Sequence, residues 1–568
     1  MLRPSGNLSR KLFSNLGLLS CLLLIYSVMG LFVIYPTGKV FYDSFFVQGS
    51  FSFANYLEFF TTPFYQSCFV NSLLLSLVCV LTSSLVGVPL AYILTRYEIR
   101  GRGFFRTLAT MPLILPPFVG AISFIFLLGR MGTLNLILID WLGIIKEPIN
   151  FIYGAHGIIF VETFHLYPLI FLNSAAALSK IDRSLEESSE LLGATPFRRF
   201  MTVTLRLVTP GYAAGAFLVF VWAFSDFGTP VVLRQYEYLG PQAYLSIIQY
   251  VDQRLLRMGL VMTVVMAAFA LLSLIIVRRY VAIREYASLA LPTPVESIKV
   301  KGLKSHLSVL FVSVVMFLSL LPHIGVTIAS LGKAWMITPF PTEYTLEYFK
   351  KVTIDLPMYI QNSFVFCTIA VILNAGLGLL IAYVLARSKF PGKDLIDSLV
   401  TLLLAVPGTV IGIAYLRAFH APLPLLGISL TQSWAIMVAV LAIRRLPYVV
   451  RSVYATLLQI HVSLEEASLV LGGNKIRTFL KITTPLIARG LLVGSIISFT
   501  TAMQELTSTA FLYRPGWETM PLGIFIYYLT GGMNEASALG VLLILVVAIS
   551  VGLANRLVGA KMGAAFGG

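Results

Sequence analysis

Runs of about twenty mostly apolar residues recur along the whole chain, separated by shorter polar stretches. A helix rises about 1.5 Å per residue, so such a run crosses the roughly 30 Å of hydrocarbon in a bilayer. The pattern predicts an all-α integral membrane protein with about twelve transmembrane helices, six in each half. The expected spans are 16–35, 67–95, 104–128, 155–178, 208–227 and 258–277, then 306–331, 362–386, 395–415, 432–455, 487–504 and 536–555.

Composition agrees with this class. Of 568 residues, 58% are hydrophobic and 12% are charged, and the mean hydropathy is +0.87. One soluble core cannot hide that much apolar surface. The net charge of +16 would also suit a nucleic-acid partner, but Lys and Arg gather between alternate apolar runs, as expected of cytoplasmic loops. We therefore expect lipid and no nucleic acid as a partner, a bacterial inner (cytoplasmic) membrane location, and both termini in the cytoplasm.

The second half of the chain repeats the first. Matched residues lie 291 positions apart early in each half and 279 positions apart later in it. They include Asn71, Arg96, Pro116, Pro168, Glu187 and Gly193, which recur as Asn362, Arg387, Pro407, Pro447, Glu466 and Gly472. Because each half has an even number of spans, the two six-helix repeats are predicted to be parallel. We expect a first unit over 1–285, a cytoplasmic linker over 286–305 and a second unit over 306–568.

Two charged segments at matched positions interrupt the apolar pattern, LEESSELLGATPFRR at 185–199 and LEEASLVLGGNKIRT at 464–478. Each has a Ser–Glu capping box, a Gly about two turns later, and a capping Thr or Asn beyond it. These residues are Ser184, Gly193 and Thr195 in the first segment and Ser463, Gly472 and Asn474 in the second. Each segment is predicted to form a helix, a sharp turn and a second helix on the cytoplasmic face. Small residues flanked by carboxylates suit a helix that lies in a partner's groove.

Both segments resemble the EAA loop of ABC importer membrane subunits, a Glu-Ala-Ala segment followed by Gly. The loops are 184–210 and 463–489, and the second ends in Thr484-Pro485-Leu486 where the first has Leu205-Arg206-Leu207. The docking residues that this resemblance implies are Glu186, Glu187, Ser188, Ser189 and Gly193, and Glu465, Glu466, Ala467, Ser468 and Gly472. It also implies a type I ABC importer permease fold, two copies of an ABC ATPase subunit, and a periplasmic or lipoprotein substrate-binding protein.

Two further stretches, FSDFGTPVVL at 224–233 and RRLPYVVRS at 444–452, resemble the ferric iron branch of these permeases. The resemblance implies ferric iron as the substrate, with a phosphonate, a sugar phosphate or thiamine as related alternatives. A twelve-span transporter driven by an ion gradient fits the span count and the repeat equally well. The charged segments favour the ATP-driven importer.

The chain carries no G-x-x-x-x-G-K-[ST] loop for a triphosphate. We therefore expect no enzyme activity and no cofactor in this chain, with ATP and Mg on the partner subunit. The four cysteines have no CxxC spacing, so no metal site is assigned.

Ionisable residues within the apolar runs are expensive and therefore candidates for the translocation path. Asp226 and Glu505 occupy matched positions near the ends of two runs, and Arg444 and Arg445 lie deep within another. Glu162 and His165 occupy the corresponding run of the first half. The alternative for each residue is a structural role, either hydrated at the interface or paired between helices.

Overall fold

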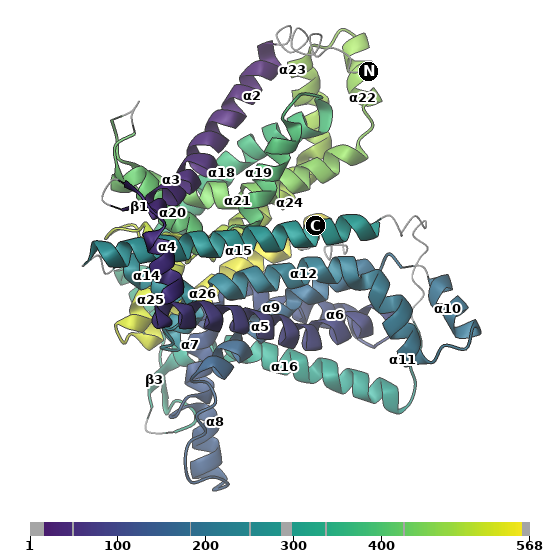
Figure 1. The fold of residues 1–568 in the computed structure, drawn as a ribbon. Coiled ribbons are helices and arrows are strands. Elements are labelled where there is room, and N and C mark those ends of the chain that lie inside the picture. Colours follow the sequence, from purple (N-terminus) through teal and green to yellow (C-terminus); the bar gives the residue numbers. More distant parts are fainter. Residues whose placement is uncertain are drawn as a thin grey trace. The chain divides into compact units, whose positions relative to one another are not determined.

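The computed structural model describes residues 16–47, 50–181, 183–248, 252–285, 298–335, 338–423 and 427–558. The N-terminal residues and most of the predicted linker lie outside these ranges. The described chain is almost entirely helical (Figure 1). Its strands form two short hairpins, β1 (Phe46–Val47) with β2 (Ser50–Phe51), and β3 (Gly332–Ala334) with β4 (Glu343–Tyr344).

Among the described residues, ten helices are long and apolar enough to cross a membrane. There are eleven if the bent pair α19 (Lys393–Ala405) and α20 (Gly408–His420) forms one span. This pair bends by 110° at the break that contains Pro407, where the missing amide hydrogen of proline interrupts the helix.

The prediction of twelve spans is not confirmed, and the expected span 432–455 accounts for the difference. This range forms α21 (Ala435–Gln459), a helix of 25 residues that is long enough to cross. However, Arg444, Arg445 and Arg451 lie within it. Its length fits a membrane span and its composition does not.

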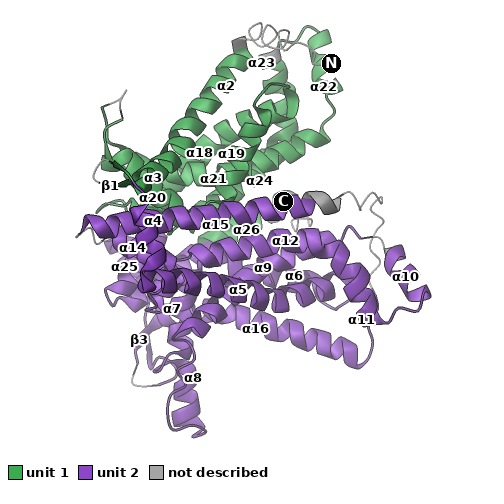
Figure 2. Cartoon of the chain, in the orientation of Figure 1, with its two compact units in different colours: residues 1–51, 360–519, 546–561 green, residues 52–359, 520–545, 562–568 purple. Residues whose placement is uncertain are grey.

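The chain folds as two compact units that do not follow the two halves of the sequence (Figure 2). Unit 1 comprises residues 1–51, 360–519 and 546–561, and unit 2 comprises residues 52–359, 520–545 and 562–568. The first long helix of the described chain, α2 (Leu16–Met29), therefore packs with second-half helices in unit 1. Likewise, the first helix of the second half packs with first-half helices in unit 2.

Unit 2 contains the long helices of the first half together with α16. Its helices are α4 (Ala54–Thr61), α5 (Pro63–Arg96), α6 (Arg102–Leu108), η2 (Met111–Ile114), α7 (Pro117–Leu128), α8 (Thr133–Leu136), η3 (Ile137–Trp141), α9 (Ala155–Leu178), α10 (Arg183–Leu191), α11 (Pro196–Arg199), η4 (Phe200–Thr204), α12 (Leu205–Ser225), α13 (Gly228–Val232), α14 (Leu239–Ile248), α15 (Gln253–Glu285), α16 (Leu303–Leu331), α17 (Glu347–Lys350), η5 (Lys351–Asp355) and α25 (Met520–Leu529). Its core includes Leu94 of α5, Phe171 of α9 and Val312 of α16. Figure 1 shows α10 and α11 at one end of this unit, and α14 and α25 at the other.

Unit 1 repeats this plan with α2 as the added helix. Beside α19, α20 and α21, its helices are α2 (Leu16–Met29), η1 (Gly30–Ile34), α3 (Tyr35–Phe45), α18 (Met358–Arg387), η6 (Leu430–Gln432), α22 (Ser463–Val470), α23 (Lys475–Thr478), η7 (Phe479–Thr483), α24 (Thr484–Met503) and η8 (Thr509–Phe511). The last helix, α26 (Met533–Val558), is divided between the two units. The core of unit 1 includes Ile25 of α2, Ile381 of α18 and Val450 of α21.

In both units a pair of glycines spaced four residues apart brings two long helices into close contact. In unit 2, a Cβ on Gly215 of α12 would lie 2.9 Å from the Leu169 carbonyl oxygen of α9. In unit 1, a Cβ on Gly494 of α24 would lie 2.9 Å from Cβ of Ser452 in α21. Small residues at this spacing let membrane helices approach closely, and the approach fixes the helices that carry the polar groups described below.

Candidate functional site

The two charged segments form the predicted helix, turn and helix, which we call elbows (residues 183–204 and 463–483). In the first elbow, Gly193 follows the end of α10 with a φ of 83°, and the Ala194 amide donates to the Ser189 carbonyl at 3.0 Å. In the second elbow, Gly472 also has a φ of 83°, and the Gly473 amide donates to Ser468 at 2.9 Å. Glycine adopts this left-handed conformation at little cost, so it ends both helices in the same way.

The N-terminal caps of these helices match the prediction in part. Thr195 accepts a hydrogen bond from the Arg198 amide at 3.4 Å, and Asn474 accepts one from the Arg477 amide at 2.7 Å, so both cap the second helix of their elbow. The expected capping box of the second elbow is wrong. There Val462 occupies the cap position without a side-chain bond, and Ser463 is the first helical residue.

A buried ion pair anchors each elbow to the end of a long helix. In unit 2, Arg96 at the end of α5 donates to Oε1 of Glu186 at 3.3 Å, and Thr204 donates to the same oxygen at 2.7 Å. The matched pair in unit 1 is Arg387 at the end of α18 with Glu465 at 3.2 Å. Thr483 donates to that carboxylate at 3.1 Å. Both carboxylates are buried, so they contact the interior of the elbow and are not on its exposed face.

The second anchor of each elbow is an aromatic pair. Tyr92 of α5 meets Phe200 with ring centroids 5.4 Å apart, and Tyr383 of α18 meets Phe479 at 4.9 Å. Phe200 and Phe479 begin η4 and η7, two π-helical turns at matched positions. A π turn shifts the side chains that follow it. In each unit the last residue of the turn is the threonine that donates to the anchor carboxylate.

The outer face of each elbow exposes the remaining predicted docking residues. Glu187 and Ser188 are exposed in the first elbow, as are Glu466 and Ala467 in the second, and Ser189 and Ser468 are half-buried. Large apolar side chains at matched positions extend this face. They are Leu191, Leu192 and Phe197, and Val470, Leu471 and Ile476, and each is at least 70% exposed. Apolar patches of this kind on polar loops mark protein interaction sites.

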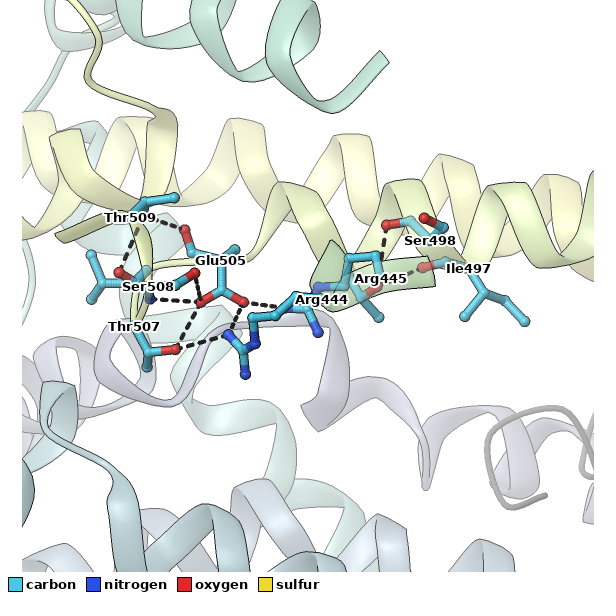
Figure 3. Close-up of polar contacts among 10 residues, drawn as sticks. Arg444, Arg445, Ile497, Ser498, Glu505, Thr507, Ser508 and Thr509 are labelled. Carbon is cyan, nitrogen blue, oxygen red and sulfur yellow. Dashed lines mark hydrogen bonds and ion pairs between the residues drawn. The ribbon is translucent and has the colours of Figure 1, made fainter. Parts of the chain in front are cut away.

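In unit 1, Glu505 lies at the centre of a polar cluster that joins α21 to the turn after α24 (Figure 3). It accepts hydrogen bonds from the Ser508 amide at 2.9 Å and the Thr507 hydroxyl at 2.7 Å, which hold the turn after α24. Arg444 and Arg445 of α21 both form ion pairs with its Oε2 atom, and Arg444 also donates to the Thr507 hydroxyl at 3.1 Å. The structure therefore brings together three of the predicted path residues.

In unit 2, the matched carboxylate has different neighbours. Asp226 accepts from the amides of Gly228 at 3.1 Å and Thr229 at 2.9 Å, and so caps α13. The Thr229 hydroxyl donates to Oε1 of buried Glu162 at 2.8 Å, which links the two acidic residues. His165 lies apart from them, with Nδ1 3.1 Å from the Pro112 carbonyl oxygen.

Sequence reasoning missed the anchor partners Arg96, Arg387, Thr204 and Thr483 as site residues. A signal for them was present, because both arginines and both threonines recur at the same spacings as the residues around them. The arginines contact their carboxylates across 90 and 78 positions of sequence and the threonines across 18 positions, and a single sequence does not reveal these contacts.

Repeated helical bundles, each with an elbow anchored to a membrane helix, define a membrane permease built by duplication. The family model for the binding-protein-dependent transport system inner membrane component matches residues 83–283 and 375–564, and the chain belongs to this family. It is therefore a multi-pass inner-membrane component of an ABC importer. It is not itself an ATPase, and ATP is handled by a partner subunit.

Two curated relatives agree with this assignment, and one solved structure resembles part of the chain. The ferric transport system permease protein FbpB of Actinobacillus pleuropneumoniae is 28% identical over 93% of this chain and 76% of its own length. The molybdenum transport system permease protein ModB of Escherichia coli K12 is 31% identical over 30% of this chain and 72% of its own length. A crystal structure of a bacterial ABC transporter for alginate matches with a TM-score of 0.41 and 18% identity, over 50% of this chain and 99% of that chain.

Proposed function

We propose that this chain is the fused permease subunit of a ferric iron importer. Its two elbows would each dock one copy of an ABC ATPase subunit, and a periplasmic or lipoprotein substrate-binding protein would deliver the substrate. The FbpB relative supports ferric iron as the substrate. Both termini would then lie in the cytoplasm with the elbows. Family membership argues against the ion-driven alternative.

The observation that carries this proposal is the duplicated elbow. Each copy combines a buried Arg–Glu–Thr anchor with an exposed apolar tip. A rigid connection to the long helices α5 and α18 would pass the closure of the ATPase dimer into the membrane. Two docking surfaces of the same form suit two copies of the same ATPase subunit.

Cysteine crosslinking tests the docking. Ser188→Cys and Ala467→Cys, both on the exposed face, should each crosslink to the ATPase subunit in the assembled transporter. Gly38→Cys, on a helix of unit 1 remote in sequence from both elbows, serves as the matched control and should not crosslink. Absence of crosslinks from both elbow positions would refute the docking role.

Removing the exposed carboxylates tests coupling. Glu187→Ala combined with Glu466→Ala should abolish ATP-driven iron uptake by whole cells while membrane levels of the chain stay unchanged. Undiminished uptake would contradict the coupling role of these residues, even if the crosslinks form.

A second substrate class has its own support. The family includes the molybdenum permease ModB, and the arginine pair of unit 1 places positive charge within a predicted span. An oxoanion such as a phosphonate or a sugar phosphate is therefore the second candidate substrate, and thiamine is the third. Identifying the ligand that copurifies with the cognate substrate-binding protein decides between them.

A further inference from the structure

The cluster around Glu505 carries more positive than negative charge. Arg444 and Arg445 both form ion pairs with the same carboxylate oxygen, Oε2 of Glu505. Among the described residues, neither arginine has another ion pair. Two guanidinium groups and one carboxylate leave a formal charge of +1, because arginine stays protonated in proteins.

Other arginines of unit 1 set this cluster apart. Arg451, two turns further along α21, forms an ion pair with Asp397 at 2.7 Å, and Arg387 pairs with Glu465, each one to one. Asp43 is shared by two cations, Lys39 and Arg417, each at 2.8 Å, but their side chains are 34% and 31% exposed. The Glu505 cluster therefore combines a surplus positive charge with cations that are largely buried.

Several hydrogen-bond donors of the two arginines are not used by the described contacts of the cluster. Each guanidinium has five N–H donors, and the described contacts use Nη1 of Arg444 and Nη2 of Arg445. The Nε atom of Arg445 is buried and has no hydrogen-bond partner among the described residues. The side chains of Arg444 and Arg445 are 14% and 12% exposed. A buried donor without an acceptor is costly. An anion would supply this acceptor together with the missing negative charge.

The start of α20 lies against the same cluster. A Cβ on Gly408, the first residue of α20, would collide with Nη1 of Arg444 and with the Thr507 hydroxyl. The N-terminal end of a helix carries partial positive charge and free amide donors. In membrane transporters, such broken helices direct their N-terminal ends at anionic groups. α20 follows the 110° bend at Pro407.

We propose that Arg444 and Arg445, with the first turn of α20, form a binding site for a small oxoanion within unit 1. The planar forks of two guanidinium groups match the oxygens of a sulfate, phosphate or carboxylate group. A single negative charge would neutralise the cluster, whose two guanidinium groups are largely buried and therefore costly to leave without a full set of counter-charges. The role of the anion in transport rests on the proposed function, whereas its binding does not.

Equilibrium binding of anions tests the site. The measurement uses the whole chain in complex with its ATPase subunits, reconstituted in nanodiscs. Radiolabelled inorganic phosphate and sulfate serve as probes, with chloride as the background anion. We expect saturable binding at one site per chain for at least one probe. Arg445→Gln should weaken this binding at least tenfold, whereas Arg451→Gln, the control on the same helix, should leave it within twofold of wild type.

A second variant keeps the test decisive if Arg445→Gln folds poorly. Glu505→Gln removes the competing carboxylate, so the anion affinity should rise severalfold. A merely structural ion pair predicts no saturable anion binding in wild type or in Glu505→Gln, and that result would overturn the proposal. Equal binding by wild type and a folded Arg445→Gln variant would overturn it as well.

Transport assays in proteoliposomes determine the role of the anion. Accumulation of labelled phosphate or sulfate on ATP addition identifies the anion as cargo, whereas uptake of labelled iron that requires the anion identifies it as a companion of the metal. Failure of the crosslinks from Ser188 and Ala467 would remove the proposed docking but leave the binding measurement standing. The two proposals can therefore fail separately.

Discussion

The elbows are alike in the two units, and the polar clusters around the matched carboxylates Asp226 and Glu505 are not. Both elbows use an Arg–Glu–Thr anchor, a Tyr–Phe pair, a π-helical turn and a glycine with the same φ of 83°. The matched carboxylates, which follow the ends of α12 and α24, differ in their neighbours. Asp226 connects through Thr229 to a second carboxylate, whereas Glu505 meets two arginines.

This difference fits the separate tasks that we propose for the two regions. Two copies of one ATPase subunit require two equivalent seats, so a change in either elbow alone would harm assembly. A single substrate passes through the membrane once, and nothing requires the two units to contact it in the same way. Duplication followed by divergence would then preserve the elbows and alter the intramembrane groups.

The largest expected effect comes from removing an anchor carboxylate. Glu186→Ala leaves Arg96 buried without a counter-ion, which costs about 3–5 kcal/mol of stability. Arg96 is 1% exposed, and its Nε and Nη1 atoms already have no partner among the described residues. We expect little folded protein in the membrane. Thermal unfolding of the purified chain in detergent measures the loss of stability.

The corresponding change in the other elbow sharpens the comparison. After Glu465→Ala, Arg387 still donates from Nη2 to the Ile460 carbonyl at 3.0 Å. We expect the loss of stability to be smaller than in Glu186→Ala by roughly 1 kcal/mol, the value of one hydrogen bond. Glu187→Ala, an exposed neighbour, is the control and should unfold like wild type. An equal loss from both anchor variants would show that the elbows are more alike than their contacts indicate.

A smaller effect is expected where the long helices approach at glycine. Gly215→Ala and Gly494→Ala each place a Cβ 2.9 Å from a neighbouring atom, so overpacking should cost about 1–3 kcal/mol. The added Cβ of Gly215→Ala meets the Leu169 carbonyl oxygen at 2.9 Å, and that of Gly494→Ala meets Cα of Val449 as well as Cβ of Ser452 at 2.9 Å. Because both glycines face backbone atoms at the same distance, the two variants should lower the unfolding temperature by similar amounts. Gly376→Ala, where nothing lies within 4 Å, is the control.

The sequence predicted the elements that depend on local patterns. The helix–turn–helix form of the elbows was predictable because Gly193 and Gly472 end helices by their own conformational freedom. The capping box at Ser463 failed because the chain enters the helix one residue earlier, at Val462. The span count failed at α21, where length and hydropathy disagree once the three arginines are considered.

Features that depend on distant contacts were not predictable from one sequence. Apolar periodicity shows that α2 and α16 are membrane helices but not which bundle each joins, so the exchange of first helices between the units was missed. The same limit applies to the site. Glu505, Arg444 and Arg445 were each candidates, but the sequence did not show that they form one cluster.

The smallest expected effect comes from removing the N-cap side chain of the second helix in each elbow, and its size should differ between the two elbows. Asn474→Ala removes a 2.7 Å hydrogen bond to the Arg477 amide and should destabilise α23 by about 1 kcal/mol. Thr195→Ala removes a longer bond of 3.4 Å, and Pro196 at the first helical position already fixes the backbone there. The cost to α11 should therefore be about half as large. Hydrogen exchange at the Arg477 and Arg198 amides measures both losses. Exchange that accelerates equally at the two amides would mean that the proline contributes nothing to the first elbow, and that the elbows differ less in their second helices than their caps indicate.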